Sequence, residues 1–525
     1  MTQHWADQIA EELIKRSPQQ KIYVFAAGIS PSGTVHIGNF RDLITPEVVA
    51  RALQSKGKKV RLLFSWDDYD RFRKVPVNVP KTFEEYIGLP LSQVPDPFGK
   101  EESYARHFEK EFETSLIELD VDTEFRYQTK LYQSGVYNDS IVEAMSKRKA
   151  IAKILSEFKT QEVKEEDIES YYPLTVYCEQ CGKDSTKILS YSDTSHELGY
   201  SCKCGHENTV DIAKKNIGKL QWKIDWPMRW RYEEVIFEPG GRDHSSPGGS
   251  YEVSSRIAKE IFNIEPPYYQ PYDFIGLRGL AAKMSGSSGI NVSPQELLEI
   301  YEPVLLRWLF LRVHPTKAFS LCFDSEIIRQ YEEFDKEVEL YLDGKLPPEQ
   351  ARVIELAITP KTKLKKNNIP FRQIASIGQI IQGNTKELER ILTEMETNYN
   401  YESLERRLKL SQRWIEKYAP EMHVRLKDSP DIDYYQQLSD KEQRDIDRFF
   451  KEIDQHWTQE DLEHFVYAIP KDPNLAMEEN KIRQRNFFKN IYQIIIGKDT
   501  GPRLATLLIA IGQKKLKSLS IPQKH

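Results

Sequence analysis

The chain has little of what marks a membrane-bound or secreted protein. Its 525 residues hold no uninterrupted apolar run of about eighteen, the length that a membrane-spanning helix needs. The segment from Met1 to Pro18 lacks the basic start and the apolar stretch of a signal peptide. Trp5, Ile9 and Leu13 recur there at helical spacing, which predicts an amphipathic helix. We therefore expect a cytoplasmic protein with no membrane partner.

Cysteine is scarce, and four of the five residues fall close together, as Cys178-x2-Cys181 and Cys202-x1-Cys204. Two thiolate pairs separated by a hairpin-sized loop form a tetrahedral site that suits zinc, and disulfides are rare in a reducing cytoplasm. We predict a structural zinc ribbon. The second pair is spaced more tightly than usual, so His206 can replace one sulfur, and a ribbon that folds without metal stays open.

The chain also lacks an excess of positive charge. Its net charge is −6, with 39% hydrophobic and 29% charged residues, which excludes a uniformly basic surface but not a local one that binds RNA. Lys361 to Lys366 and Lys514 to Lys517 are candidate basic patches, and an ordinary solvated surface is the alternative for each. The length predicts about three or four domains, and no internal repeat is present.

The stretch from Gly28 to Asn39, which reads GISPSGTVHIGN, follows a short apolar run from Ile22 to Ala27. That run is typical of a strand buried on both faces in a parallel sheet. A helix is expected to start near His36, where free N–H groups favour phosphate oxygens and the imidazole can donate a hydrogen bond. An ordinary turn before a helix is the alternative.

A second loop, Lys283 to Gly289, lies much later in the chain and reads KMSGSSG. Together the two loops predict an ATP site. A second strand, Lys59 to Trp66, delivers Asp67, Asp68 and Asp70 at its carboxyl end, which is where open α/β sheets bind ligands.

A second half of the nucleotide-binding fold is expected after a long insertion. It begins with a tryptophan-rich segment at residues 218–230, followed by a strand from Glu234 to Phe237, the sequence GGRDH at 240–244 and a helix through Ile261. Plain core packing is the alternative role for the tryptophans. From about residue 295 onward the pattern is helical, and apolar residues recur on one face of the last long helix.

The two loops resemble the ATP motifs of class I aminoacyl-tRNA synthetases, His-Ile-Gly-His and Lys-Met-Ser-Lys-Ser. Asn39 stands at the fourth position of the first motif, and Gly286 replaces the second lysine of the other. The resemblance implies His36 and Lys283 as catalytic residues. The ATP-binding residues that it implies are Thr34, His36, Gly38, Asn39, Gly241, Asp243, Lys283, Ser285 and Ser287.

Nearly the whole chain is similar to the class I lysyl-tRNA synthetases. This resemblance rests on both loops, the acidic segment after Trp66, the tryptophan segment, the Gly-x-Asp-His element and the tail Gly501-Pro502-Arg503. It implies an α/β fold with a Rossmann-type parallel sheet, an inserted connective domain with a zinc ribbon, and an all-α anticodon-binding domain. We expect an N-terminal helix at 1–20, Rossmann halves at 21–90 and 216–295, a connective insertion at 91–215 with the ribbon at 172–210, a stem-contact region at 296–350, and the helical domain at 351–525.

The same resemblance implies a two-step reaction in which lysine and ATP with Mg²⁺ form lysyl-adenylate, and the lysyl group then passes to tRNA(Lys). It also implies that tRNA must be bound before lysine is activated. We expect a monomer. Gly28, Ser30, Trp222, His244 and Tyr272 are the lysine-binding residues that it implies.

Asp68 is our own choice as the partner of the lysine ammonium group, because a cationic side chain calls for a carboxylate. Arg71, Arg73 and Arg242 can equally serve a substrate carboxylate, so residue types alone leave glutamate or arginine open as the substrate. The alternative from a different functional class is that the protein binds tRNA without catalysing a reaction.

Overall fold

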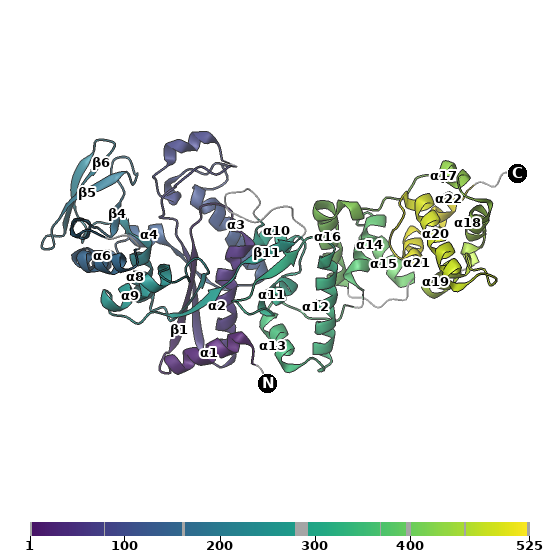
Figure 1. Ribbon diagram of the computed structural model, residues 1–525, viewed down its shortest axis with the longest axis horizontal. Helices are drawn as coiled ribbons and strands as arrows, with labels where there is room; N and C mark the ends of the chain where they lie inside the picture. Colours follow the sequence, from purple (N-terminus) through teal and green to yellow (C-terminus); the bar gives the residue numbers. More distant parts are fainter. Residues whose placement is uncertain are drawn as a thin grey trace. The chain divides into compact units, whose positions relative to one another are not determined.

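The computed structural model describes residues 3–77, 79–159, 163–278, 292–367, 369–394, 401–455 and 458–521. The chain forms two compact units that interleave along the sequence. Unit 1 comprises Met1–Leu298, Pro303–Leu321 and Pro347–Lys363, and unit 2 comprises Glu299–Glu302, Cys322–Leu346 and Leu364–His525. Both are coloured by sequence in Figure 1.

The centre of unit 1 is a five-stranded sheet in which all neighbouring strands are parallel. Its order is β10-β9-β1-β2-β3, with bounds β1 Ile22–Ile29, β2 Lys59–Trp66, β3 Glu124–Tyr127, β9 Phe237–Gly241 and β10 Tyr268–Tyr272. The chain therefore places β2 and β3 on one side of β1, and later places β9 and β10 on the other side. The carboxyl ends of β1 and β9 border the point where the order reverses, which is where such sheets bind ligands.

Helices pack against this sheet and close its core. Alongside β1 and β2 lies α2, which follows the glycine-rich loop, and α8 packs on α9 (Figure 1). The helices of this region are α1 Trp5–Arg16, α2 Ile37–Ser55, α3 Tyr104–Leu119, α8 Trp222–Glu233, α9 Ser250–Glu260, α10 Pro294–Leu298, α11 Pro303–Leu311 and α13 Pro348–Ala357, with 3₁₀ turns at Lys81–Tyr86 and Leu91–Gln93. A short pair, β11 Ile275–Arg278 and β12 Phe319–Cys322, completes it.

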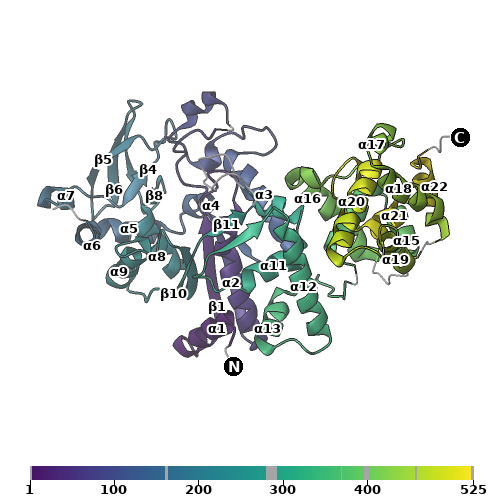
Figure 2. The same ribbon diagram turned by 45° about the vertical axis from the view of Figure 1, so that its right-hand side comes forward.

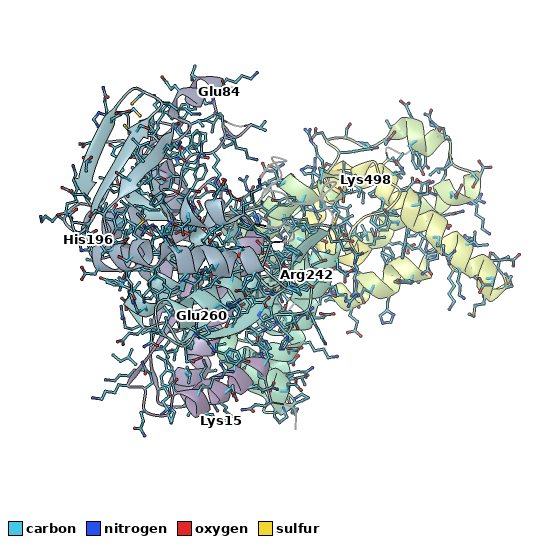
Figure 3. All side chains as sticks on the ribbon, turned by 60° about the vertical axis from the view of Figure 1, so that its left-hand side comes forward. Lys15, Glu84, His196, Arg242, Glu260 and Lys498 are labelled. Atoms are coloured by element: carbon cyan, nitrogen blue, oxygen red, sulfur yellow. The ribbon has the colours of Figure 1, made fainter. Side chains whose placement is uncertain are left out.

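A smaller body of short helices and strands lies between β3 and β9 in sequence. Figure 2 shows its strands and helices gathered in one region, and Figure 3 labels His196 in the turn between β5 and β6. Its elements are α4 Gln128–Gln133, α5 Asn138–Ser146, α6 Arg148–Glu157, α7 Glu165–Glu169, β4 Leu174–Val176, β5 Thr186–Tyr191, β6 Glu197–Cys202, β7 Glu207–Asp211 and β8 Gly218–Leu220. β5, β6 and β7 form an antiparallel sheet, and β4 pairs with β8.

The described part of unit 2 is helical. Its helices are α12 Glu326–Leu342, α14 Phe371–Ile380, α15 Thr385–Glu394, α16 Tyr401–Tyr418, α17 Ile432–Gln436, α18 Asp440–Glu452, α19 Gln459–Ala468, α20 Met477–Ile496, α21 Leu504–Ile511 and α22 Gln513–Ser518, with 3₁₀ turns at Pro420–Met422 and Ile453–Gln455. Leu504, Leu507, Leu508 and Ile511 of α21 are buried in its core, as their spacing predicts.

The parallel sheet and the helical C-terminal region confirm the predicted fold class, with local differences. The predicted strand from Glu234 to Phe237 is instead β9, because α8 runs through Glu233 and Glu234 caps it in a left-handed conformation. β3 pairs with β2 although it lies in the stretch assigned to the insertion. Among the described residues, no helix has both the length and the apolar character to cross a membrane.

Candidate active site

A cavity of about 900 Å³ lies at the carboxyl ends of β1, β2 and β9. The close approach of β1 to β2 shapes its floor: a Cβ on Gly28 would lie 2.8 Å from the carbonyl oxygen of Ser65, closer than real Cβ atoms come. Glycine is therefore required at this position. The same residue offers its N–H to the Asp42 carboxylate, at 3.2 Å.

His36 stands at the N-cap position of α2 and lines the cavity. Its side chain does not cap the helix, and its Nδ1 is buried with no hydrogen-bond partner among the described residues. Burial lowers the pKa of His36, so the ring is neutral near pH 7. A neutral imidazole at a helix N-terminus can donate one hydrogen bond to a phosphate oxygen, where the helix already favours negative charge.

Two carboxyl groups, the half-buried Asp42 and the buried Glu238, face the cavity. Burial raises the pKa of Asp42 to about 8, and the hydrogen bonds from Gly28 and Tyr272 only partly oppose this. Burial likewise raises the pKa of Glu238 to about 7, although the Trp230 Nε1 donates to its carboxylate at 2.6 Å. Within the described chain, no lysine or arginine forms an ion pair with either group. The cavity thus presents two carboxyls without an ion pair, although the charge of Arg229 still lowers the pKa of Glu238.

An aromatic wall stands beside these carboxyls. Trp222 and Trp226 of α8 stack with their ring centroids 4.9 Å apart. The ring centroids of His244 and Trp226 are 5.7 Å apart. The Nε1 atom of Trp222 is buried with no hydrogen-bond partner in the described part of the chain, whereas Trp226 hydrogen-bonds to the Glu238 carboxylate. The Oδ2 atom of Asp243 lies 3.5 Å from Nε2 of His244. The preceding residue in the chain is the exposed Arg242, which Figure 3 labels. Flat π faces next to carboxylates suit an alkyl-ammonium side chain.

The remaining acids of the cavity wall are already paired. Lys219 of β8 forms ion pairs with Asp67 and Asp70, and Arg229 of α8 pairs with Asp67 and Asp225. Burial alone would raise the pKa of Asp67, but Arg229 and Lys219 outweigh it and lower that pKa. This network fixes α8, and therefore the aromatic wall, against the end of β2.

The four clustered cysteines lie outside this cavity, in the β5–β7 body. The Sγ atoms of Cys178 and Cys204 are 3.7 Å apart, as are those of Cys181 and Cys202, and all four lie within 4.8 Å of one another. A tetrahedral zinc with Zn–S distances of about 2.3 Å requires S···S separations of about 3.8 Å, so the set fits the metal. Burial alone would raise the pKa of Cys178, but the N–H groups of Cys181 and Gln180 lower it to about 7, which favours a thiolate ligand.

Comparison with known proteins agrees with this geometry. The family described as "tRNA synthetases class I (K)" matches residues 3–359. This chain belongs to that family. A lysine–tRNA ligase of Streptomyces coelicolor is 37% identical over 99% of this chain and 98% of its own length. One of Borreliella burgdorferi is 37% identical over 99% of each chain, and one of Pyrococcus horikoshii is 36% identical over 97% of each.

Family membership confirms the predicted resemblance, and the cavity gathers most of the predicted site. The predicted residues that line it are Gly28, Ser30, His36, Gly38, Asn39, Trp222, Gly241, Asp243, His244 and Tyr272. Thr34 is not among the lining residues and interacts with Glu111 instead. The predicted Lys283, Ser285 and Ser287 lie outside the described residues of this class I synthetase.

The choice of Asp68 as an ammonium partner is not supported. Its side chain is buried at 5% exposure, does not line the cavity, and accepts a hydrogen bond from the Thr129 N–H at 2.8 Å. Burial raises the pKa of Asp68 to about 6. In the turn after β2, Asp68 is directed to Thr129, whereas Asp67 and Asp70 line the cavity.

Asp42 is the residue that sequence reasoning missed. It lies six positions after His36 in α2, and the helix around it is buried at nearly every position. A carboxylate placed inside so buried a helix was the available signal, since such groups are rarely buried without a partner or a function.

Proposed function

We propose that this class I synthetase attaches L-lysine to tRNA(Lys) in an ATP-dependent reaction through a lysyl-adenylate. The observation that carries the proposal is the match to lysine–tRNA ligases over nearly the full length of both chains. The cavity supports it, because Asp42 and Glu238 provide carboxyls without an ion pair beside an aromatic wall.

Charge alone does not exclude glutamate as the substrate. A glutamate side chain needs a free arginine or lysine at the cavity. Lys219 and Arg229 are already held by aspartates and Arg71 pairs with Asp184 at 3.1 Å, but Arg73 also lines the cavity and forms no ion pair among the described residues. The relatives' names therefore favour lysine over glutamate. Charge does not distinguish an arginine substrate from lysine, because the guanidinium group is also a cation. The relatives' names favour lysine over arginine.

For the bound lysine we propose that the ε-ammonium lies near Asp42 and Glu238, with its alkyl chain along Trp222 and His244. Gly28 and Ser30 would hold the α-amino and carboxylate end, and Tyr272 would close the pocket. These placements keep five of the six predicted lysine-binding residues and replace Asp68 with Asp42.

For ATP we propose that the phosphates lie at the N-terminus of α2, contacted by His36 and by the backbone of Gly38 and Asn39. Gly241 and Asp243 would contact the ribose. Mg²⁺ bound with ATP would neutralise phosphate charge. The lysine carboxylate attacks the α-phosphorus and pyrophosphate leaves; the 2′-hydroxyl of the terminal adenosine then attacks the lysyl carbonyl and AMP leaves. Neutral His36 acts as a hydrogen-bond donor to the phosphate as its charge develops.

We further propose that Cys178, Cys181, Cys202 and Cys204 bind one structural Zn²⁺. The support is the tetrahedral spacing of their Sγ atoms. The metal would hold the β5–β7 body together, as structural zinc sites do, and takes no part in the chemistry.

The roles assigned to the other regions belong to the same proposal. The insertion at 91–215 would guide the acceptor end of tRNA, residues 296–350 would contact its stem, and residues 351–525 would bind its anticodon. A monomeric state and a cytoplasmic location stay predictions.

ATP–pyrophosphate exchange with each of the amino acids, with and without tRNA, tests the substrate. We expect exchange with lysine alone, and only when tRNA(Lys) is present. Exchange with glutamate or arginine would replace the proposal with the corresponding synthetase. No exchange with any amino acid, together with retained tRNA binding, would indicate a non-catalytic relative.

A further inference from the structure

The hydroxyl of Tyr132 holds the start of α8 at two points. It donates a hydrogen bond to Oδ1 of Asp225, which lies in the first turn of the helix. It also accepts a hydrogen bond from the Leu220 N–H at 3.3 Å, just before the helix begins. The first residue of α8 is Trp222, so these two contacts bracket it in the sequence.

Neither Tyr132 nor Asp225 reaches the cavity. Both side chains are fully buried, and neither is among the residues that line the cavity. Tyr132 belongs to α4, where its ring packs on those of Tyr69 and Tyr137 with centroids 5.4 and 5.0 Å apart. A group in this place can affect a substrate only through another residue.

Trp222 depends on this anchoring because its own polar atom has no partner. Its Nε1 is buried without a hydrogen bond to any described residue. The other two tryptophans of α8, Trp226 and Trp230, both hydrogen-bond to the Glu238 carboxylate. The indole along which we place the lysine side chain is therefore held by the backbone of α8 and by packing.

Arg229 joins Asp225 to this indole. Its guanidinium pairs with Oδ2 of Asp225 and with Asp67 at the end of β2. Its central carbon lies 5.6 Å from the centroid of the Trp222 ring, within the range of a cation–π contact. Asp225 thus receives the Tyr132 hydroxyl on one oxygen and Arg229 on the other, and buried contacts connect the hydroxyl to the indole.

We propose that Tyr132 is a positioning residue for lysine, because its hydroxyl fixes the start of α8 and thereby the indole of Trp222 that packs along the substrate. The inference rests on the proposed function, which supplies lysine as the substrate. Tyr132 has no contact with the region of the phosphates at His36. Loss of its hydroxyl should therefore weaken lysine binding and leave the chemical step unchanged.

Steady-state ATP–pyrophosphate exchange by the full-length protein, with tRNA present, tests this. Tyr132→Phe removes the hydroxyl and keeps the ring. Because a buried carboxylate loses a hydrogen bond, we expect the KM for lysine to rise about tenfold. The kcat and the KM for ATP should stay within about twofold of the wild type. A purely structural role would lower the folded fraction, and with it kcat, while the KM for lysine stayed the same.

A double-mutant cycle with Trp222→Ala tests whether Tyr132 acts through the indole. Trp222→Ala should itself raise the KM for lysine about tenfold or more, since it removes the packing surface. In that background Tyr132→Phe should change the KM by no more than about twofold, because the group that it positions is gone. Effects that multiply in full would mean that Tyr132 acts by another route.

The matched control is Tyr137→Phe. Tyr137 is also buried and packs on Tyr132, but its hydroxyl donates to Gln128 at 3.2 Å. This variant should keep the KM for lysine within about twofold of the wild type. If Tyr132→Phe fails to fold, Asp225→Asn breaks the same chain of contacts at the next residue and should raise the KM for lysine in the same selective way.

Near-ultraviolet circular dichroism adds a measurement that needs no substrate, since it reports the packing of aromatic side chains. Trp222 and Trp226 are stacked, so Tyr132→Phe should change the tryptophan signal in the same sense as Trp222→Ala, and Tyr137→Phe should not. The proposal is overturned if Tyr132→Phe leaves both this signal and the KM for lysine unchanged, or lowers kcat alone. If the wild type activates another amino acid, the proposed function fails, but the dichroism and the same cycle with that amino acid still decide the role of Tyr132.

Discussion

At the scale of single residues, the proposed lysine site depends on the carboxyls of Asp42 and Glu238. Removing a charged partner at a partly desolvated site costs about 1.5–3 kcal/mol, so we expect Asp42→Asn to raise the KM for lysine about tenfold or more. The KM for ATP should barely change. Asp68→Asn is the matched control, since Asp68 lies outside the cavity and its substitution should leave the KM for lysine within about twofold. Equal effects of the two variants would contradict the assignment.

The raised pKa of Asp42 makes a second prediction about pH. Burial raises this pKa from its ordinary value to about 8, so the folded protein holds a proton that the unfolded chain has lost, and the free energy of unfolding falls as pH rises from about 4 to about 8. A bound ammonium favours the ionised carboxylate. We therefore expect lysine affinity to rise with pH up to about 8, with proton release on binding near pH 7. Calorimetry in two buffers of different ionisation enthalpy measures that release, and pH-independent binding would argue against it.

His36 gives the third prediction. A hydrogen bond that strengthens as charge develops on phosphate acts mostly in the transition state, so His36→Ala should slow adenylate formation about 10²-fold while ATP binding changes little. His36→Asn, which keeps a donor, should recover part of the rate. Pyrophosphate exchange at saturating lysine and tRNA measures the first effect, and equilibrium dialysis with ATP measures the second. A loss below about fivefold would show that His36 only shapes the loop.

At the scale of elements, the β5–β7 body, which holds the four clustered cysteines, contacts the wall of the cavity. The Asp184 N–H donates to the Gly88 carbonyl at 2.9 Å, and the Asp184 carboxylate pairs with Arg71, which lines the cavity. Loss of the metal would therefore loosen a contact that reaches the substrate site, even though the cysteines do not.

The metal prediction follows from this element. We expect elemental analysis of freshly purified protein to find about one zinc per chain, and Cys202→Ser with Cys204→Ser to remove it and lower the melting temperature. Cys322→Ser, at the cysteine outside the cluster, is the control and should keep the metal. Less than about 0.2 metal per chain in the wild type would contradict the site.

Elements also show what sequence could and could not predict. His36, Gly28 and the strand before them were predictable because a strand, a glycine-rich loop and a helix start leave local signals. Asp42 was not, and neither was the choice of Asp67 over Asp68 as the cavity residue, because their partners, Tyr272 and Arg229, lie far away in the chain and only the fold brings them together. The bounds of β9 were misplaced because the end of α8 depends on Glu234 adopting a left-handed conformation.

At the scale of the whole molecule, α11 and α13 belong to unit 1 although they follow part of unit 2 in sequence. Arg307 of α11 is buried and binds the Glu47 carboxylate of α2 at 2.8 Å and the Ala357 carbonyl of α13 at 3.0 Å. These contacts place the predicted boundary at residue 296 inside a continuous core, whatever role residues 296–350 have.

Truncation tests that core. Removing one partner of a buried ion pair costs about 3–5 kcal/mol, so a fragment of residues 1–298 should fail to unfold cooperatively, whereas residues 1–363 should retain a cooperative transition. Thermal unfolding followed by circular dichroism measures both. A cooperative transition in the shorter fragment would show that α11 and α13 are dispensable.

The interleaving of the two units bears on how the chain folds while it is being made. Ribosomes add about 5–20 residues per second, and an N-terminal domain usually folds before the next one emerges. Here the first unit is incomplete until residue 363 has left the ribosome, after a segment of the second unit has already appeared. During that interval the side of α2 that carries Glu47 lacks α11 and α13, so the core beneath His36 and Asp42 closes only after residue 363 has emerged.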